Sequence, residues 1–108
     1  MKEKQRIYIS GPISGHDLTE RRNAFLGVQT RLELMGYEVA NPFNNGQPQD
    51  ATIYAHMRSD IEMLLACDCI YMMRRWSHSK GCLTELMVAT AIGLPVIYEE
   101  SHTMIKFE

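Results

Sequence analysis

Hydrophobic residues in this chain form short β-rich runs that alternate with longer stretches of helical periodicity. The β-rich runs, each bounded by turn formers, are residues 7–9, 37–40, 69–73 and 95–98. Between them, apolar residues recur every three or four positions, as on one face of a helix. The helical positions are Ala24, Phe25, Val28, Leu32 and Met35, then Ile53, Met57, Ile61, Leu64 and Leu65, then the apolar stretch 81–92. The first helix is expected to start at an Asp17–Glu20 capping box and to end at Gly36.

Strands that alternate with helices are typical of a mostly parallel sheet covered on both faces, with right-handed crossovers. The sequence therefore predicts one α/β domain over residues 1–108, a flavodoxin-like or Rossmann-like three-layer sandwich. Its sheet would have four strands, or five if the tail from Glu99 adds a short one. No repeat or linker divides the chain.

In open parallel sheets, ligands bind beyond the carboxyl ends of the strands. This rule selects three loops as the candidate site, residues 10–17, 41–50 and 74–81. The first (SGPISG) offers amides and hydroxyls suited to a phosphate or sugar, although a plain tight turn explains it equally well. It lacks a phosphate-binding lysine, and its proline breaks the dinucleotide fingerprint, which argues against a P-loop nucleotidase or a dehydrogenase. The loop lengths predict a small pocket.

Composition narrows the function further. The chain has 108 residues, 45% of them hydrophobic, and a net charge of -2. It therefore has no basic surface for nucleic acid, and no stretch is apolar enough to cross a membrane. Because the first strand follows a short polar start, we expect a cytoplasmic protein. The cysteines lack zinc-site spacing, so we expect reduced thiols and no metal.

Glu85 is the only strongly ionisable residue in an otherwise apolar helix. With Gly81 at the start of that helix, Glu85 would lie in or near the first turn, where the helix dipole favours an ionised carboxylate. That setting suits a nucleophile. The alternative is a glutamate that only caps the helix or complements its dipole.

Asp60 lies beside the apolar stripe of the second helix and should be half-buried. The alternative is a solvent-facing aspartate that pairs with Arg58 or Arg22. His56, one turn earlier, either contacts a ligand or is structural. Before the third helix, Ser79 and nearby amides would face an anion, while Trp76 either stacks on a base or covers the core edge.

The order and spacing of several motifs resemble the nucleoside 2-deoxyribosyltransferase superfamily over almost the whole chain. The motifs are Tyr-x-x-Gly (Tyr8, Gly11), Asp60, and Gly-x-x-x-Glu with a later Ala and Gly-x-Pro-Val (Gly81, Glu85, Ala89, Gly93, Pro95, Val96). The layout is most similar to a small branch known only as a domain of unknown function, whose members begin with a Tyr-Ile-Ser-Gly-Pro-Ile strand.

The resemblance implies that Glu85 attacks the anomeric carbon of a 2-deoxyribose and that Tyr8 holds this nucleophile. Asp60 would contact the sugar or protonate the leaving base, for which half burial would raise its pKa. No cofactor or metal is implied. The remaining substrate-binding positions are Ser10, Gly11, Pro12, Ser14, Gly15, Asn41, Pro42, His56, Ser79 and Gly81.

One difference bears on the substrate. Transferases that act on free nucleosides often carry an aspartate where this chain has Ser79, whereas Ser-x-Gly-x-x-x-Glu resembles the branch that hydrolyses 2-deoxynucleoside 5-monophosphates. A hydroxyl can donate a hydrogen bond to an anion, whereas a carboxylate would repel the anion. We therefore expect a phosphorylated substrate, with Ser14 and Ser79 as anion contacts. The arginine that this branch carries in its first loop is missing, so His16, Lys80 or a neighbouring subunit would compensate.

Two other functions stay open. The chain could be a nucleotide-binding module or sensor without turnover, or it could cleave another ribosyl compound such as a dinucleotide cofactor, which a small pocket disfavours. The resemblance also implies a homo-oligomer, in which the tail 101–108 could form the contact. The predicted partner is a small nucleoside or nucleotide.

Overall fold

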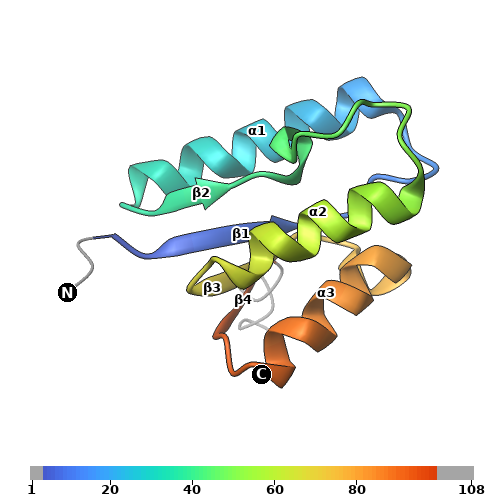
Figure 1. The fold of residues 1–108 in the computed structure, drawn as a ribbon. Coiled ribbons are helices and arrows are strands. Elements are labelled where there is room, and N and C mark those ends of the chain that lie inside the picture. The colour runs from blue at the N-terminus through green and yellow to red at the C-terminus, as the bar shows by residue number, and fades with distance from the viewer. Residues whose placement is uncertain (1–3, 100–108) are drawn as a thin grey trace.

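The computed structural model describes residues 4–99, which contain the strands and helices in the predicted order (Figure 1). The strands are β1 (Arg6–Ser10), β2 (Glu38–Ala40), β3 (Cys69–Met72) and β4 (Val96–Tyr98). The helices are α1 (Leu18–Leu34), α2 (Ile53–Leu65) and α3 (Lys80–Ala91). The tail, where a fifth strand and a subunit contact were predicted, lies outside the described residues.

All four strands are parallel, in the order β2-β1-β3-β4. After β1 the chain crosses to β2 at one edge of the sheet, and after β3 it crosses to β4 at the other edge. The loops that follow the two central strands therefore lead in opposite directions. This arrangement is the switch point at which flavodoxin-like folds bind ligands. The predicted fold class, a flavodoxin-like three-layer sandwich around a parallel sheet, is confirmed, with four strands among the described residues.

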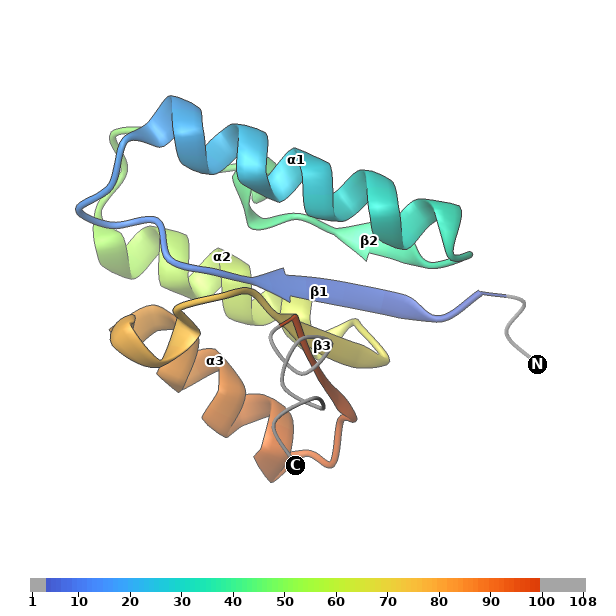
Figure 2. The same ribbon diagram turned by 180° about the vertical axis from the view of Figure 1, so that it is seen from behind.

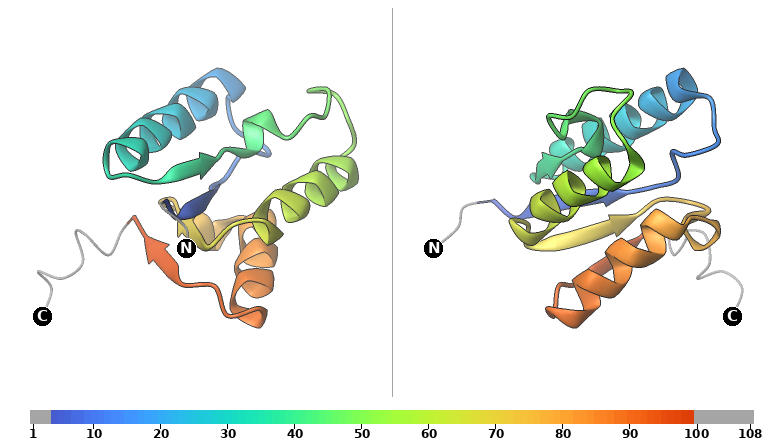
Figure 3. Two further views of the ribbon diagram at one scale, coloured as in Figure 1. Left: turned by 60° about the vertical axis from the view of Figure 1, so that its left-hand side comes forward. Right: turned by 45° about the vertical axis from the view of Figure 1, so that its right-hand side comes forward.

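The two faces of the sheet carry different helices, α1 on one side and α2 with α3 on the other (Figure 3). On β1, Ile7 and Ile9 pack in the core under α1, whereas Tyr8 packs in the core under α2 and α3. This separation follows from the alternation of side chains along a strand. It also decides which β1 residues can meet α3.

Helix α1 begins where the sequence predicts, because the Asp17 carboxylate accepts a hydrogen bond from the amide of Thr19. Its last residue is Leu34, and the predicted terminating glycine, Gly36, directly follows the C-cap. Met35 is the C-cap and is 68% exposed, so its assignment to the apolar stripe is wrong. Gly36 has a φ of 101°, the left-handed conformation in which a glycine terminates a helix.

The polar loop 41–50 was predicted to lack regular structure, but it contains a 3₁₀ turn, η1 (Pro42–Asn44). A second 3₁₀ turn, η2 (Trp76–His78), precedes α3. The amino ends of α1, α2 and α3 lie at one end of the molecule (Figure 2, left). None of the helices within residues 4–99 is long and apolar enough to cross a membrane.

Candidate active site

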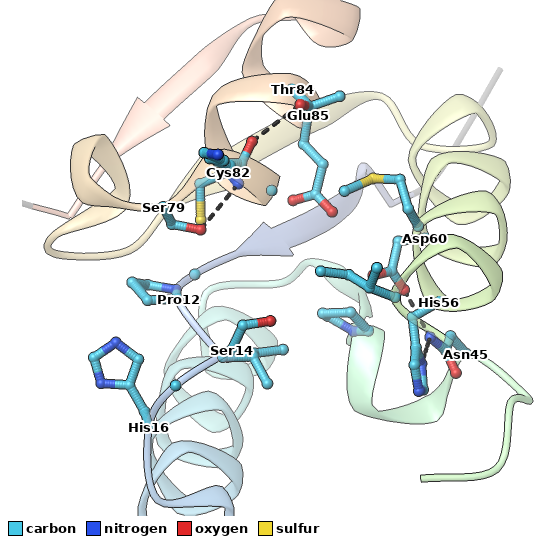
Figure 4. Close-up of a pocket in the computed structure, with 18 of the residues that line it drawn as sticks. Pro12, Ser14, His16, Asn45, His56, Asp60, Ser79, Cys82, Thr84 and Glu85 are labelled. Carbon is cyan, nitrogen blue, oxygen red and sulfur yellow. Dashed lines mark hydrogen bonds between the residues drawn. The ribbon is translucent and has the colours of Figure 1, made fainter. Parts of the chain in front are cut away.

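A cavity of about 900 Å³ opens at the carboxyl ends of the strands, and it is lined from all three predicted loops together with α2 and α3 (Figure 4). Small-molecule sites typically occupy roughly 300–1,000 Å³. The cavity lies near the upper end of this range, so it is larger than the small pocket that the loop lengths predict.

Glu85 is buried in the wall of this cavity, with 6% of its surface exposed. It lies in the second turn of α3, and the first turn contains no acidic residue. The interpretation that Glu85 caps the helix is therefore wrong. Both carboxylate oxygens accept hydrogen bonds from β1: the Tyr8 hydroxyl donates to Oε2 at 2.8 Å, and the Ser10 hydroxyl donates to Oε1 at 2.6 Å.

The spacing of Tyr8 and Ser10 explains this contact. Residues two apart on a strand point to the same face, and here that face is covered by α3. The Tyr8 side chain is fully buried and Ser10 is nearly so. Both hydroxyls are therefore fixed by the sheet, and they hold the Glu85 carboxylate in one orientation.

Burial raises the pKa of Glu85 from 4.5 to about 7, although the hydrogen bonds from Ser10 and Tyr8 act in the opposite direction. The negative charge of Asp60 raises this pKa further. The helix dipole was predicted to favour the ionised form of Glu85. The net effect is the opposite, because burial of the carboxylate raises its pKa more than the favourable contacts lower it. Near neutral pH the carboxyl exchanges readily between its charged and neutral forms.

Asp60 is half-buried on α2, as predicted, and it also lines the cavity. Its Oδ1 accepts a hydrogen bond from Asn45 Nδ2 at 2.9 Å. Burial raises the pKa of Asp60, while this hydrogen bond and the nearby His56 lower it. Among residues 4–99, no salt bridge joins Asp60 to an arginine, so the pairing with Arg58 or Arg22 is not found.

Ser79 is the N-cap of α3, and its hydroxyl oxygen accepts a hydrogen bond from the amide of Cys82 at 3.2 Å. The Cys82 amide therefore already has an acceptor. Lys80 and Gly81 also lie in the first turn of α3, where backbone amides have no acceptor within the helix. Ser79, Lys80 and Gly81 all line the cavity. The predicted anion-facing helix end thus lies at the cavity wall.

Most of the predicted substrate-binding residues line this one cavity: Gly11, Pro12, Ser14, Gly15, Pro42, His56, Ser79 and Gly81. Three predicted residues do not. Tyr8 and Ser10 lie behind Glu85, and Asn41 caps η1 while its amide donates to Gln29. Trp76 packs against Tyr98 in the core and is absent from the cavity lining, so it covers the core edge.

Sequence reasoning missed Asn45, which links Asp60 to His56. An asparagine in a turn-rich loop carries no distinguishing signal, because turns favour this residue anyway. The cysteines of the described region, Cys67, Cys69 and Cys82, are buried, and they form no disulfide with one another. Within residues 4–99, no cluster of three metal-ligating side chains was found.

Known proteins with this fold include two enzymes. A 2-deoxyribosyltransferase from Bacillus psychrosaccharolyticus has a TM-score of 0.67 and 18% identity, covering 86% of this chain and 70% of its own. A 2-deoxyribosyltransferase from Leishmania mexicana has a TM-score of 0.69 and 22% identity, covering 87% of this chain and 63% of its own. At these identities, the similarity concerns the fold.

A conserved protein from Enterococcus faecalis V583 has a TM-score of 0.65 and 29% identity, covering 88% of this chain and 62% of its own. The chain therefore spans less than two thirds of this protein and of the Leishmania enzyme. No curated protein sequence matches it significantly. A family model for a domain of unknown function (DUF4406) matches residues 5–98. The chain therefore belongs to the DUF4406 family and has the fold of the 2-deoxyribosyltransferases.

Proposed function

We propose that this protein cleaves the N-glycosidic bond of 2-deoxynucleosides or their 5-monophosphates, with Glu85 as the nucleophile. The observation that carries the proposal is the buried Glu85 carboxylate, which Tyr8 and Ser10 orient at the wall of the cavity. Figure 4 shows the carboxylate directed into the space between α3 and α2. The fold similarity to two 2-deoxyribosyltransferases agrees with this chemistry.

The reaction would proceed in two steps. In the first, an ionised Glu85 oxygen bonds to the anomeric carbon, and the bond from that carbon to the base breaks with its electron pair going to the base. In the second, water or the nitrogen of another base attacks the same carbon and releases Glu85. Water gives hydrolysis, and a second base gives transfer.

Asp60 is the candidate acid for the leaving base. Its position in the same cavity and its raised pKa support this role, because an acid must hold its proton until the base departs. In the second step the ionised Asp60 would accept the proton of the attacking water or base. The same carboxyl then returns to its starting state.

A phosphorylated substrate fits the composition of the cavity wall. Ser14 and Ser79 supply hydroxyls on the side where α3 begins, and His16 and Lys80 line the same cavity. An anion near the amino end of α3 would also benefit from the helix dipole. These groups would replace the first-loop arginine that the chain lacks.

The direct experiment incubates the purified protein with each 2-deoxynucleoside 5-monophosphate and measures free base by chromatography. We expect release by the native protein and its loss in Glu85→Ala. Glu62→Ala is the matched control, since Glu62 is an exposed glutamate on α2 outside the cavity. Release that is unchanged in Glu85→Ala would refute Glu85 as the nucleophile.

A nucleotide-binding module without turnover is the second candidate. One observation favours it: both oxygens of Glu85 already accept hydrogen bonds, and a pKa of about 7 leaves much of the carboxyl protonated at neutral pH. Calorimetry with the same nucleotides separates the two functions. Binding without base release from any of them, or from the free nucleosides, would support the module.

A further inference from the structure

We propose that Asn45 is a positioning residue that fixes the Asp60 carboxyl and selects which of its oxygens carries the catalytic proton. The inference rests on the proposed function, in which Asp60 is the acid. Its basis is a hydrogen-bond network around Asn45. The backbone amide of Gln47 determines which group donates and which accepts at each contact of this network.

The orientation of the Asn45 side chain follows from Gln47. The Gln47 amide donates to Asn45 Oδ1 at 2.9 Å. A backbone N–H can only donate, so the atom facing it must be the carbonyl oxygen of the side chain. The Asn45 amide nitrogen therefore points the other way, toward α2.

That nitrogen has two hydrogens and two acceptors. Asn45 Nδ2 lies 2.9 Å from Asp60 Oδ1 and 3.1 Å from His56 Nδ1. Because both hydrogens are donated, His56 Nδ1 must accept, and the ring proton sits on Nε2, which is 3.4 Å from the carbonyl oxygen of Gln49. Every group in the network thus has one defined role.

The loop that carries Asn45 is tied to its surroundings, so this amide is held in place. Gln47 Nε2 donates to the Ser59 hydroxyl at 2.8 Å, and Arg22 donates to the Gln49 side chain at 2.9 Å. The segment is therefore a wall of the cavity whose position relative to both α1 and α2 is defined by hydrogen bonds.

Two consequences follow for Asp60. The Asn45 hydrogen bond favours Oδ1 as the carbonyl-type acceptor, so the proton of the neutral acid favours Oδ2. The same bond lowers the pKa of Asp60 against the effect of burial, and a protonated His56, in which Nδ1 would no longer accept from Asn45, would lower it further. The other ionisable groups that interact with Asp60 are Glu85 and Tyr8. Asn45 thus sets both the geometry and the acidity of the acid.

The test uses Asn45→Ser and Asn45→Ala. A serine hydroxyl can still accept from the Gln47 amide and preserve the turn, but it is too short to reach Asp60. Asn44→Ala is the matched control, because Asn44 is an exposed neighbour outside the cavity lining. Carbon-detected NMR titration follows the Asp60 carboxyl, assigned by its disappearance in Asp60→Asn.

We expect the Asp60 titration midpoint to move to higher pH in both Asn45 variants and to stay unchanged in Asn44→Ala. In the presence of substrate, the alkaline limb of the pH profile of kcat should also move to higher pH in both Asn45 variants. The value of kcat should fall by about tenfold to a hundredfold, with little change in KM. A purely structural residue would not move the titration of Asp60.

An Asp60 midpoint that is the same in native protein and in folded Asn45→Ser would overturn the positioning role, whatever the activity. If the midpoint moves but the native protein releases no base, the hydrogen-bond network stands and the proposed function fails. The two failures are therefore distinguishable.

Discussion

Replacing Glu85 by glutamine should stabilise the folded protein at alkaline pH, because the substitution removes a buried charge and keeps the shape of the side chain. The local hydrogen bonds can adapt to it. Tyr8 can still donate to the amide oxygen, and the amide nitrogen can donate to Ser10, whose hydroxyl lies within hydrogen-bonding reach of the Cys82 sulfur. The main change is therefore electrostatic.

The magnitude follows from the pKa of Glu85, which is 4.5 ordinarily and about 7 in the folded protein. Between these values the folded state keeps a proton that the unfolded state has lost. The resulting stability is fully present below about pH 4.5 and is lost as the pH rises through about 7. The loss amounts to roughly 3 kcal/mol, since one pH unit corresponds to about 1.4 kcal/mol.

Urea denaturation from about pH 5 to about pH 9 measures this loss. The difference in free energy of unfolding between Glu85→Gln and native protein should shift by roughly 3 kcal/mol in favour of glutamine across that range. Taking the difference cancels the other ionisable groups to first order. Glu62→Gln, at an exposed position on α2, should show no such trend. Parallel curves for native protein and Glu85→Gln would refute the assignment of a raised pKa to Glu85.

The hydroxyl of Tyr8 and the packing at Gly11 give further predictions. Tyr8→Phe removes a hydrogen bond that lowers the pKa of Glu85, so the NMR titration midpoint of that carboxyl should rise further; an unchanged midpoint would contradict the contact. Gly11→Ala would place a Cβ atom 2.5 Å from the Met73 sulfur and should lower the free energy of unfolding by about 1–3 kcal/mol. Gly27→Ala, in α1 with nothing within 4 Å of the new Cβ, should instead raise it by about 0.5–1 kcal/mol, and denaturation that gave both variants the same sign would contradict this packing.

The sequence predicted the fold because its signals are local. The run 69–73 became β3 (Cys69–Met72) and the pattern over 53–65 became α2 with the same limits. Side-chain burial was predicted less well: Ile53 and Leu65 belong to the predicted apolar stripe of α2, yet both are more than half exposed. Periodicity identifies a face of a helix, but not how much of that face a neighbour covers.

Most members of the candidate site were predictable, together with the contact between Tyr8 and Glu85, but Asn45 and the contact between Ser10 and Glu85 were not. Glu85, Tyr8 and Asp60 were all identified, while Ser10 was assigned to the substrate and instead donates to Glu85. The two residues are 75 positions apart, and their contact depends on how α3 crosses the sheet. Asn45 was missed for the same reason, since its role exists only once the loop 41–50 is laid against α2.

The protonation states of Glu85 and Asp60 decide whether the first step of the proposed reaction can begin. Burial raises the pKa of Glu85 to about 7, and burial also raises the pKa of the half-buried Asp60, against the hydrogen bond from Asn45 and the nearby His56. The two carboxyls interact and line one cavity, so a single proton can reside on either of them, while the proposed chemistry needs it on Asp60. A bell-shaped pH profile is the same for either placement of the proton. A bound base that accepts a hydrogen bond from Asp60 would favour the form in which Asp60 is protonated and Glu85 is ionised, so substrate itself should place the proton on Asp60.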